Sequence, residues 1–561
     1  MKKQLLILAG FLSCLFSFAQ TVNIPDANFK AYLVGNPAIN TNGDNEIQVF
    51  EASGFTGVID CSNKNISSLL GIEYLKEITG LDCSLNFIQQ LDLSNNKKLI
   101  TLNCSGITVD EYGYNEYPNG QIETLNLTQN TNLKTLICSG NRFTSLDLSK
   151  NLQLNYLDCS YNRNFIYENE QSIEVSLTNL DISKNINLKH LDCHNNQISS
   201  FDLSKNIELE LLNCDYNKLN LLNIYNNTKL ATLSCKNYYW IPGASLLSTL
   251  DISNNINLET LNCSGNSLTN LDITQNPNLT YLDCTDNKLF NLNIIQNSKL
   301  IHLDCGSNEI SSLNLMYSPQ LEYVNCSYNS LTHIDLSQNF NLKHFGCHNN
   351  QLTHLDVTAN TKLEGLYCTN NNLTELDISK NILLKLDGLY CYGNKLTKLD
   401  VSHNPNLIQI FAIPNYELKE LNLKNGNNVR VNFYILPNTL HALAPKLFCV
   451  EVDDVNWYNQ NSSTFLDYIG QGAIYSTNCN QTLATNQTQR PQTKIYPNPV
   501  KNSLKIQTEH KFQKVEIYST TGQLVKTSFL KETNLSNLPK GNYVVKITTD
   551  KSVITEKVIK E

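Results

Sequence analysis

The sequence predicts a long solenoid of stacked repeats, built mostly of β-strands and turns, followed by a small C-terminal β-sandwich. Fifteen cysteines from Cys61 to Cys391 recur mostly every 21 residues, and apolar residues recur with them at fixed offsets. A fixed period of this length is the signature of a repeat architecture. Residues 494–561 instead alternate apolar and polar side chains in short runs broken by turn residues, which is typical of antiparallel strands.

The chain opens with a segment typical of a secretory signal peptide, residues 1–19. Lys2 and Lys3 precede an apolar run, and Ser17 and Ala19 occupy the small-residue positions of a cleavage site. No later stretch approaches the ~20 apolar residues that a transmembrane helix needs. We therefore expect an exported protein without a transmembrane segment.

Overall charge excludes one class of partner. The formal net charge is −9, and the sequence has no block of lysine and arginine. A nucleic-acid binder would show a concentrated basic surface. The sequence therefore predicts that nucleic acid is not a partner.

Residues 20–60 are predicted to form an N-terminal cap. Residues 23–33 read as a short capped helix that closes the exposed end of the solenoid. The segment that follows resembles an EF-hand loop in the placement of its oxygen-bearing side chains, Asn40, Asn42, Asp44, Glu46 and Glu51. Asn40 replaces the usual first Asp, and Asn45 stands where the loop normally has Gly. A calcium site and a simple polar turn both remain open.

One complete repeat, residues 279–300, shows how the solenoid is built. It follows the pattern L-x-x-L-x-C-x-x-N-x-L, which is the leucine-rich-repeat signature with cysteine at an apolar position. Leu282-Asp283-Cys284 is predicted to be a short strand with Leu282 and Cys284 facing inward. Asn287 is predicted to turn the chain and to cap backbone groups of neighbouring coils. Residues 61–427 thus predict an α/β-type leucine-rich-repeat solenoid with units of about 21 residues.

The cysteines of the repeat are predicted to be free thiols that fill the interior as small apolar side chains. Cysteines at equivalent places on parallel strands point the same way, which suits neither a disulfide nor a tetrahedral metal site. A second triplet in each unit, such as Leu271-Asp272-Ile273, lays a row of Asp or Asn along the opposite face. We expect these side chains to bond to neighbouring Ser, Thr and Asn.

The run from Cys61 to about Asn427 resembles the internalin-like leucine-rich repeats of bacterial surface proteins. This resemblance covers about two thirds of the chain. It implies a solenoid that binds proteins, glycans or surfaces, and it leaves the ligand open.

Aromatic and histidine side chains gather at the strand positions that face outward on the concave side. His344 and His348 share a strand and lie near 13 Å apart, about four residues at 3.3 Å each, so they cannot share one metal ion. We predict surface histidines or a ligand-contacting stripe. The candidate ligand-binding residues of this face are Tyr156, His190, Tyr216, Tyr281, His302, Tyr323 and His344.

Three insertions interrupt the 21-residue period. The intervals from Cys104 to Cys138 and from Cys159 to Cys193 span 34 residues, and the interval from Cys235 to Cys263 spans 28. All three follow the strand and its turn, so we expect them to leave the solenoid at one edge. Exposed aromatic residues on loops over a rigid scaffold favour a binding site, and packing onto the solenoid is the alternative. The candidate residues are Tyr112, Tyr114, Tyr117, Phe165, Tyr167, Tyr238 and Trp240.

Residues 428–479 resemble the closing cap of such repeat proteins. Cys449 and Cys479 fall outside the repeat pattern and are the candidates for a disulfide in an oxidising compartment. Residues 480–493 are polar and are predicted to be a linker.

The last module, residues 494–561, carries three short motifs: Tyr496-Pro497-Asn498-Pro499, residues 519–523 and residues 538–543. Together they resemble the type IX secretion (Por) sorting domain, type A. This resemblance implies a Gram-negative bacterium, a partner in the type IX secretion machinery, and a product that is secreted or held at the outer cell surface.

Catalytic signatures are absent: the sequence has no G-x-S-x-G elbow, no H-E-x-x-H and no phosphate-binding loop. The sequence therefore predicts a non-catalytic protein that mediates protein or glycan binding and adhesion. The alternatives are a structural surface-coat component and, less favoured, an enzyme with a site on the loop edge. No cofactor is predicted apart from the calcium of the residue 40–51 loop.

Overall fold

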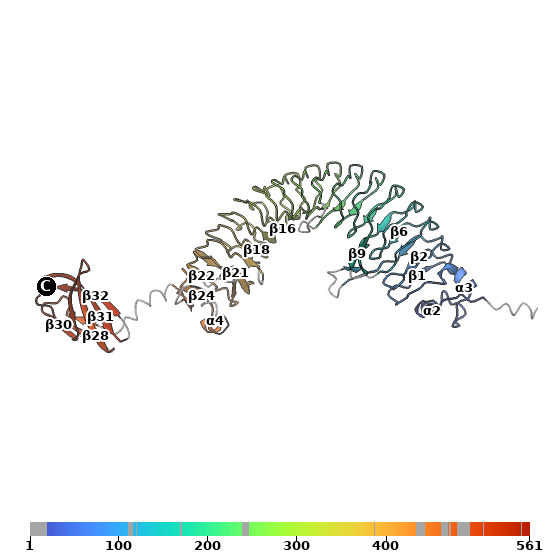
Figure 1. Cartoon of the computed structure of the whole chain (residues 1–561). Coiled ribbons are helices and arrows are strands. Elements are labelled where there is room, and N and C mark those ends of the chain that lie inside the picture. Colours follow the sequence, from blue (N-terminus) through green and yellow to red (C-terminus); the bar gives the residue numbers. More distant parts are fainter. Residues whose placement is uncertain are drawn as a thin grey trace, which may run out of the picture. The chain divides into compact units, whose positions relative to one another are not determined.

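The computed structural model describes residues 20–109, 116–118, 120–168, 171–237, 246–385, 388–433, 444–461, 469, 473–479, 494–508, 510–550 and 553–561. The predicted signal peptide lies outside these residues. The chain divides into two compact units, residues 1–475 and 476–561 (Figure 1).

The N-terminal cap contains the predicted helix. Helix α2 (Ala27–Val34) starts at Asp26, whose Oδ1 accepts the N–H groups of Asn28 and Phe29. Phe29 and Leu33 are buried and belong to the same hydrophobic core as the coils. A second helix, α3 (Val49–Gly54), and a 3-10 turn, η1 (Ile72–Tyr74), complete the cap around the first strand, β1 (Val58–Asp60). The apolar end of the solenoid is thereby covered.

A 17-stranded parallel sheet runs through the first unit, one short strand per coil, and lines the inner side of its arc (Figure 1). Neighbouring strands pair in register, so that Tyr281, Leu282 and Asp283 lie beside His302, Leu303 and Asp304. The predicted leucine-rich-repeat solenoid is thus confirmed, and its strands are paired in register. After β1 the strands are β2 (Gly80–Asp82), β3 (Thr101–Asn103), β6 (Thr135–Ile137), β7 (Tyr156–Asp158), β10 (His190–Asp192), β11 (Leu211–Asn213), β12 (Thr232–Ser234), β13 (Thr260–Asn262), β14 (Tyr281–Asp283), β15 (His302–Asp304), β16 (Tyr323–Asn325), β17 (His344–Gly346), β18 (Gly365–Tyr367), β19 (Leu389–Tyr390), β21 (Gln409–Ile413) and β23 (Arg430–Phe433).

Inward side chains of every coil form one continuous core. Leu282 and Cys284 are fully buried, and the fifteen repeat cysteines are free thiols. Burial raises the pKa of the Cys61 thiol to about 12. These cysteines therefore act as apolar filling for the interior.

Asparagine closes the turn after most strands of the main sheet. The Nδ2 of Asn287 donates to the carbonyls of Cys263 and Cys284, and its Oδ1 accepts the N–H of Leu268. Each such side chain satisfies backbone groups of two coils that would otherwise be buried without partners.

The opposite side of most coils is irregular. Asp272 accepts the N–H and the hydroxyl of Thr274, and the other Asp residues of this row make equivalent contacts. Among the described residues of this side, only the last triplets pair as strands, in a four-stranded sheet formed by β20 (Lys398–Asp400), β22 (Glu420–Asn422), β24 (Cys449–Glu451) and β25 (Ile474–Ser476).

Two of the three insertions are β-hairpins, which the sequence analysis treated as loops. One pairs β4 (Ile107–Val109) with β5 (Glu116–Pro118), and the other pairs β8 (Arg163–Glu168) with β9 (Gln171–Ser176). At the base of the first hairpin, a Cβ on Gly106 would lie 2.2 Å from the Cα of Gly120, and a Cβ on Gly120 would lie 2.6 Å from the carbonyl oxygen of Gly140. The two ends of this hairpin can therefore approach so closely only with glycine at both positions. The third insertion, residues 238–245, lies outside the described residues.

The C-terminal cap joins β24, helix α4 (Val455–Asn461) and β25. Tyr458 is buried and donates its hydroxyl proton to the carbonyl of Val429. Cys449 and Cys479 are disulfide-bonded. Because all fifteen repeat cysteines are free, these two are each other's partner within the described part of the chain.

The second unit is a small sandwich of two antiparallel sheets. Val515, Ile517, Val545 and Ile547 are among the residues of its separate core. The predicted β-sandwich is therefore confirmed. One sheet has the order β26 (Lys494–Tyr496), β27 (Ser503–Gln507), β30 (Glu532–Asn534), and the other has the order β29 (Leu524–Ser528), β28 (Phe512–Ser519), β31 (Gly541–Thr549), β32 (Val553–Lys560).

Candidate binding face

The parallel sheet sorts the outward side chains of the coils into columns, because in-register strands place equivalent residues side by side. The first strand residues form an aromatic column, defined as Tyr156, His190, Tyr281, His302, Tyr323 and His344, all half-buried. The third strand residues form an acidic column, defined as Asp60, Asp82, Asp158, Asp192, Asp283 and Asp304.

Rings of the aromatic column stack on one another along the solenoid. The ring centroids of Tyr281 and His302 are 4.4 Å apart, and those of His302 and Tyr323 are 4.2 Å apart with planes at 1°. Tyr156 and His190 stack in the same way at 4.1 Å. Since the ring faces cover each other, a ligand would meet ring edges, which carry the tyrosine hydroxyls and the histidine nitrogens.

The stacked rings stay uncharged near neutral pH. Burial lowers the pKa of the His302 and His190 imidazoles and raises the pKa of Tyr323 to about 12. A neutral imidazole keeps one donor and one acceptor nitrogen. The stacked rings thus offer hydrogen-bonding groups but no positive charge that would balance the negative charge of the neighbouring carboxylates.

Amides and backbone N–H groups hold the acidic column in place. Asn325 donates to both carboxylate oxygens of Asp304, at 3.0 and 3.2 Å. Thr285 donates its N–H to Asp283. These contacts fix the carboxylates without adding positive charge.

A second cluster lies on β7 and β10–β12 and the turns that follow them. His194 contacts Asp192 through Nδ1, and Asp215 accepts the Ser234 hydroxyl and the Lys236 N–H, both at 2.7 Å. The Lys236 Nζ lies 5.1 Å from the ring centroid of Tyr216. Burial raises the pKa of the Asp215 carboxyl. A carboxylate kept where burial opposes its charge is typical of a functional site.

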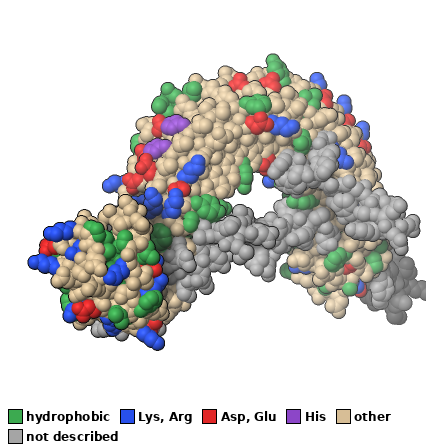
Figure 2. All heavy atoms as spheres, turned by 60° about the vertical axis from the view of Figure 1, so that its left-hand side comes forward, with side chains coloured by type: hydrophobic (Ala, Val, Ile, Leu, Met, Phe, Trp, Pro, Cys, Tyr) green, Lys and Arg blue, Asp and Glu red, His purple; other side chains and the backbone are tan. Residues whose placement is uncertain are grey.

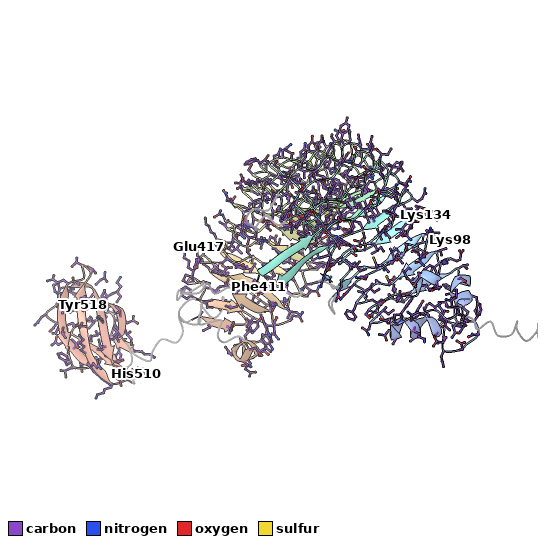
Figure 3. All side chains as sticks on the ribbon, turned by 45° about the vertical axis from the view of Figure 1, so that its right-hand side comes forward. Lys98, Lys134, Phe411, Glu417, His510 and Tyr518 are labelled. Carbon is purple, nitrogen blue, oxygen red and sulfur yellow. The ribbon has the colours of Figure 1, made fainter. Side chains whose placement is uncertain are left out.

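The structure places the predicted concave residues in three separate groups: Tyr156 with His190, Tyr216 beside Lys236, and the run from Tyr281 to His344. Leu211, Thr232 and Thr260 separate His190 from Tyr281 in the column. Tyr367, Tyr390 and Phe411 form a separate aromatic line on β18, β19 and β21, in register with Gly346 and thus with the acidic column. The ring centroids of Tyr390 and Phe411 are 4.3 Å apart, and Phe411 is labelled in Figure 3. Tyr117, Phe165 and Tyr167 lie in strands of the two hairpins. Tyr112, Tyr114, Tyr238 and Trp240 lie outside the described residues.

Oxygen atoms of the EF-hand-like loop are engaged in internal hydrogen bonds. Glu51 accepts the N–H groups of Thr41, Asn42 and Gln48, and Asn40 accepts the N–H of Gly43. Glu46 pairs with Lys30 at 2.6 Å. These side-chain oxygens fit a self-capped polar turn better than a calcium site, because a calcium ion would have to displace the backbone N–H groups that they already accept. Calcium binding stays a prediction.

Sequence reasoning missed the acidic column as a candidate site, although the repeated Leu-Asp-Cys triplets carry its signal. It also missed a hollow of about 520 Å³ on the opposite face, lined by residues that include His354, Asp356, Glu375 and Asp377. Figure 2 shows histidines (purple) beside acidic side chains (red) on the surface of the first unit.

Within the described ranges, no group of three or more His, Cys, Asp or Glu side chains is arranged to hold a metal ion. Over the same residues, no helix combines the length and the apolar character needed to cross a membrane.

Fold and face together define a class: the chain is a leucine-rich-repeat solenoid protein with structural similarity to the internalins. The functional domain of InlJ from Listeria monocytogenes, which includes a cysteine ladder, aligns at 26% identity with a TM-score of 0.54, over 97% of this chain and 98% of that one. A leucine-rich-repeat protein of Leptospira interrogans aligns at 20% identity and a TM-score of 0.52, over 72% of this chain and 97% of that one.

A plant peptide hormone receptor in complex with RGF2 shares the fold at 18% identity and a TM-score of 0.51, over 72% of this chain and 69% of that one. No curated protein sequence matches the chain.

The C-terminal unit has a specific assignment. Residues 494–561 match the secretion system C-terminal sorting domain. This domain marks the protein for secretion or for attachment at the outer cell surface, as its motifs predicted.

Proposed function

We propose that this protein is a non-catalytic surface protein, exported by type IX secretion, that binds an extracellular protein or glycan through the concave face of its solenoid. The observation that carries this proposal is the pair of columns on β14–β16, where the edges of stacked rings lie beside the carboxylates of Asp283 and Asp304. Both columns stand on a rigid parallel sheet, so they are preorganised for a ligand.

Polar character sets the chemistry of the proposed partner. The concave face offers tyrosine hydroxyls, imidazole nitrogens and carboxylates, while burial keeps His190 and His302 uncharged near neutral pH. A partner rich in hydrogen-bond donors complements such a face. Sugar hydroxyls and basic or amide side chains both meet this requirement.

The two hairpins support the same location. The β4–β5 and β8–β9 hairpins each follow a strand of the main sheet by a few residues, so they rise from the edge of the concave face. Projecting segments beside a rigid sheet are a common site of recognition.

One observation favours the alternative of a structural coat component. Leu152, Ile186 and Ile207 lie at equivalent turn positions of adjacent coils and are 50%, 53% and 52% exposed. An apolar row of this kind could pack molecules side by side. We favour the binding role because the concave face offers preorganised hydrogen-bonding groups.

The test is a glycan array and a pull-down from whole cells with residues 20–490, run with and without calcium. We expect a specific, saturable ligand, and calcium dependence would support the residue 40–51 loop. Failure to find any saturable ligand would favour the coat component.

Two variants locate the binding face. The first variant is Tyr281→Thr/His302→Thr/Tyr323→Thr, because threonine already stands at the first strand position in Thr232 and Thr260. The second is Asp283→Asn/Asp304→Asn, because asparagine already stands at the third strand position in Asn262 and Asn325. We expect each variant to weaken binding more than about tenfold, by the usual cost of contact residues. The matched control is Asp272→Asn/Asp356→Asn on the opposite row, where Asn293 already makes the same cap. If all three variants bound the ligand as tightly as the natural protein, the concave face would be excluded as the binding site.

Loop residues need a separate variant. Replacing Tyr114, Tyr167 and Trp240 together with Ala tests whether the insertions take part. Unchanged binding would limit the site to the sheet.

A further inference from the structure

The sorting domain has two unlike edges on its four-stranded sheet. In the order β29-β28-β31-β32, the outer strands are β29 and β32. An unpaired edge strand is a template for another strand, so proteins normally protect such edges. The two edges of this sheet are treated differently.

The β32 edge is covered by the segment around Asn498 and Val500. Val500 donates its N–H to the carbonyl of Ile559 at 2.7 Å, and Glu561 donates back to Val500 at 3.0 Å. Asn498 donates to the carbonyl of Lys557 and accepts the N–H of Ile559. The outward backbone groups of Lys557, Ile559 and Glu561 are therefore already used.

The β29 edge has no such cover. Among the described residues, its only strand partner is β28, with Tyr518 beside Leu524 in the register. Within the described part of the chain, the hydrogen bond that leads from β29 to another strand besides β28 is made by a side chain, from the Lys526 Nζ to the carbonyl of Asn534.

Apolar side chains cluster at this open edge. Phe529 is 73% exposed and Leu530 is 70% exposed, the largest values among the described apolar residues, and Leu524 and Val525 are also exposed. Figure 2 shows hydrophobic side chains (green) among lysines (blue) on the near face of this unit. Four exposed apolar residues within seven positions oppose solubility, so we look for a partner that covers them.

We propose that the β29 edge, with Leu524, Val525, Phe529 and Leu530, is the surface through which the sorting domain is recognised by a protein of the secretion machinery. The partner would add a β-strand to this edge and would take Phe529 and Leu530 into an apolar pocket. Strand addition gains affinity from main-chain hydrogen bonds and specificity from side-chain pockets. The sorting role of residues 494–561 supplies the partner, and the proposal does not depend on what the solenoid binds.

The experiment follows export of the full-length protein in cells with a type IX system. Phe529→Ser/Leu530→Ser removes the apolar anchors, and Val525→Lys places a charge on the edge, which blocks strand addition. The matched control is Val553→Ser/Ile559→Ser, which removes two exposed apolar residues from β32, whose edge is covered from Lys557 to Glu561.

We expect both β29 variants to lower the protein in the medium and on the cell surface more than about tenfold, with precursor accumulating inside. The control should be exported normally. Thermal unfolding of the purified proteins distinguishes lost recognition from lost folding. If the serine double variant is unfolded, the export of Val525→Lys tests the proposal in its place.

Normal export of a folded β29 variant would overturn the proposal. So would an equal loss of export in the control. A full-length protein that forms dimers through this edge, and whose monomeric β29 variant is still exported, would show that a second copy is the partner and would overturn it as well.

Discussion

At the scale of single residues, asparagine connects the coils in two separate columns. Asn287 represents the first, with all of its polar atoms engaged. Asn276 represents the second: its Nδ2 donates to the carbonyls of Ile252 and Asn255, at 3.1 and 2.9 Å. Its Oδ1 has no partner among the described residues. The second column therefore needs only a donor, which explains why Ser318 can stand there and donate to Asn297.

We predict that Asn276→Ala lowers the free energy of unfolding by about 2 kcal/mol, since two buried hydrogen bonds are lost at about 1 kcal/mol each. Asn276→Ser should cost about half as much, because the serine can keep one bond. Urea unfolding of residues 20–479 measures both. Equal losses for the two variants would contradict the donor-only role of this column.

The Asp215 carboxyl gives a pH prediction at the same scale. Burial raises its pKa in the folded state above the unfolded value of about 3.9. Folding therefore favours the protonated form, and stability is lost as the pH rises from about 4 through the folded pKa. Asn at this position keeps an acceptor for Ser234 and Lys236.

We expect Asp215→Asn to unfold at a higher urea concentration than the natural protein at pH 7 and at the same concentration near pH 3. Unfolding curves at several pH values check this. A variant that is less stable at pH 7 would show that the charge of Asp215 helps the fold. Greater stability with weaker ligand binding would show a carboxylate retained for function.

At the scale of elements, the solenoid is a regular coil with hairpins added between coils. The β8–β9 hairpin begins directly after Asn162 and ends directly before Leu177, and Leu177 donates its N–H to the carbonyl of Asn162 at 3.2 Å. The two ends of the insertion are thus already in contact. In an uninterrupted coil a single residue separates Asn from the next apolar position, as Lys288 separates Asn287 from Leu289.

Deleting residues 164–176 should therefore restore the 21-residue period from Cys159 to Cys193 and leave the solenoid folded. We expect an unchanged far-ultraviolet circular dichroism spectrum and a melting temperature within a few degrees of the natural one, because a ΔΔG of 1 kcal/mol shifts a large domain by about 2–4 °C. Loss of ligand binding by the folded deletion variant would assign the hairpin to the binding site. An unfolded variant would instead show that the hairpin packs on the coils as part of the fold.

At the scale of the whole molecule, the two units differ in architecture and in charge. The solenoid and the sorting domain have separate hydrophobic cores with no shared residue. Residues 494–561 contain twelve lysines and six acidic residues, whereas the whole chain carries a net charge of −9. The first unit is therefore strongly acidic and the second basic.

Separate cores predict separate unfolding. Calorimetry of the full chain should show two transitions, each at the temperature found for residues 20–479 or 494–561 alone. A single transition at a temperature of its own would show that the two units stabilise each other.

The sequence by itself determined the repeat, its inward positions and the identity of the sorting domain. A period of 21 residues, carried by Cys284 and its equivalents, fixes which side chains are buried, because every coil must hide the same apolar face. Asp26 and the residues after it specify the capping helix locally. The aromatic face was predicted as a set of residues for the same reason: strand alternation decides which side chains point outward.

Only the tertiary structure decided how those side chains meet. The near-parallel stacking of His302 on Tyr323, the raised pKa of Asp215 and the pairing of β20 with β22 depend on neighbours twenty or more residues away. The folding of two insertions into hairpins and the open edge at β29 depend on backbone pairing, which the sequence pattern leaves free. A period fixes the direction of each side chain, whereas contacts between coils also depend on register, rotamers and burial, and these exist only once the coils are stacked.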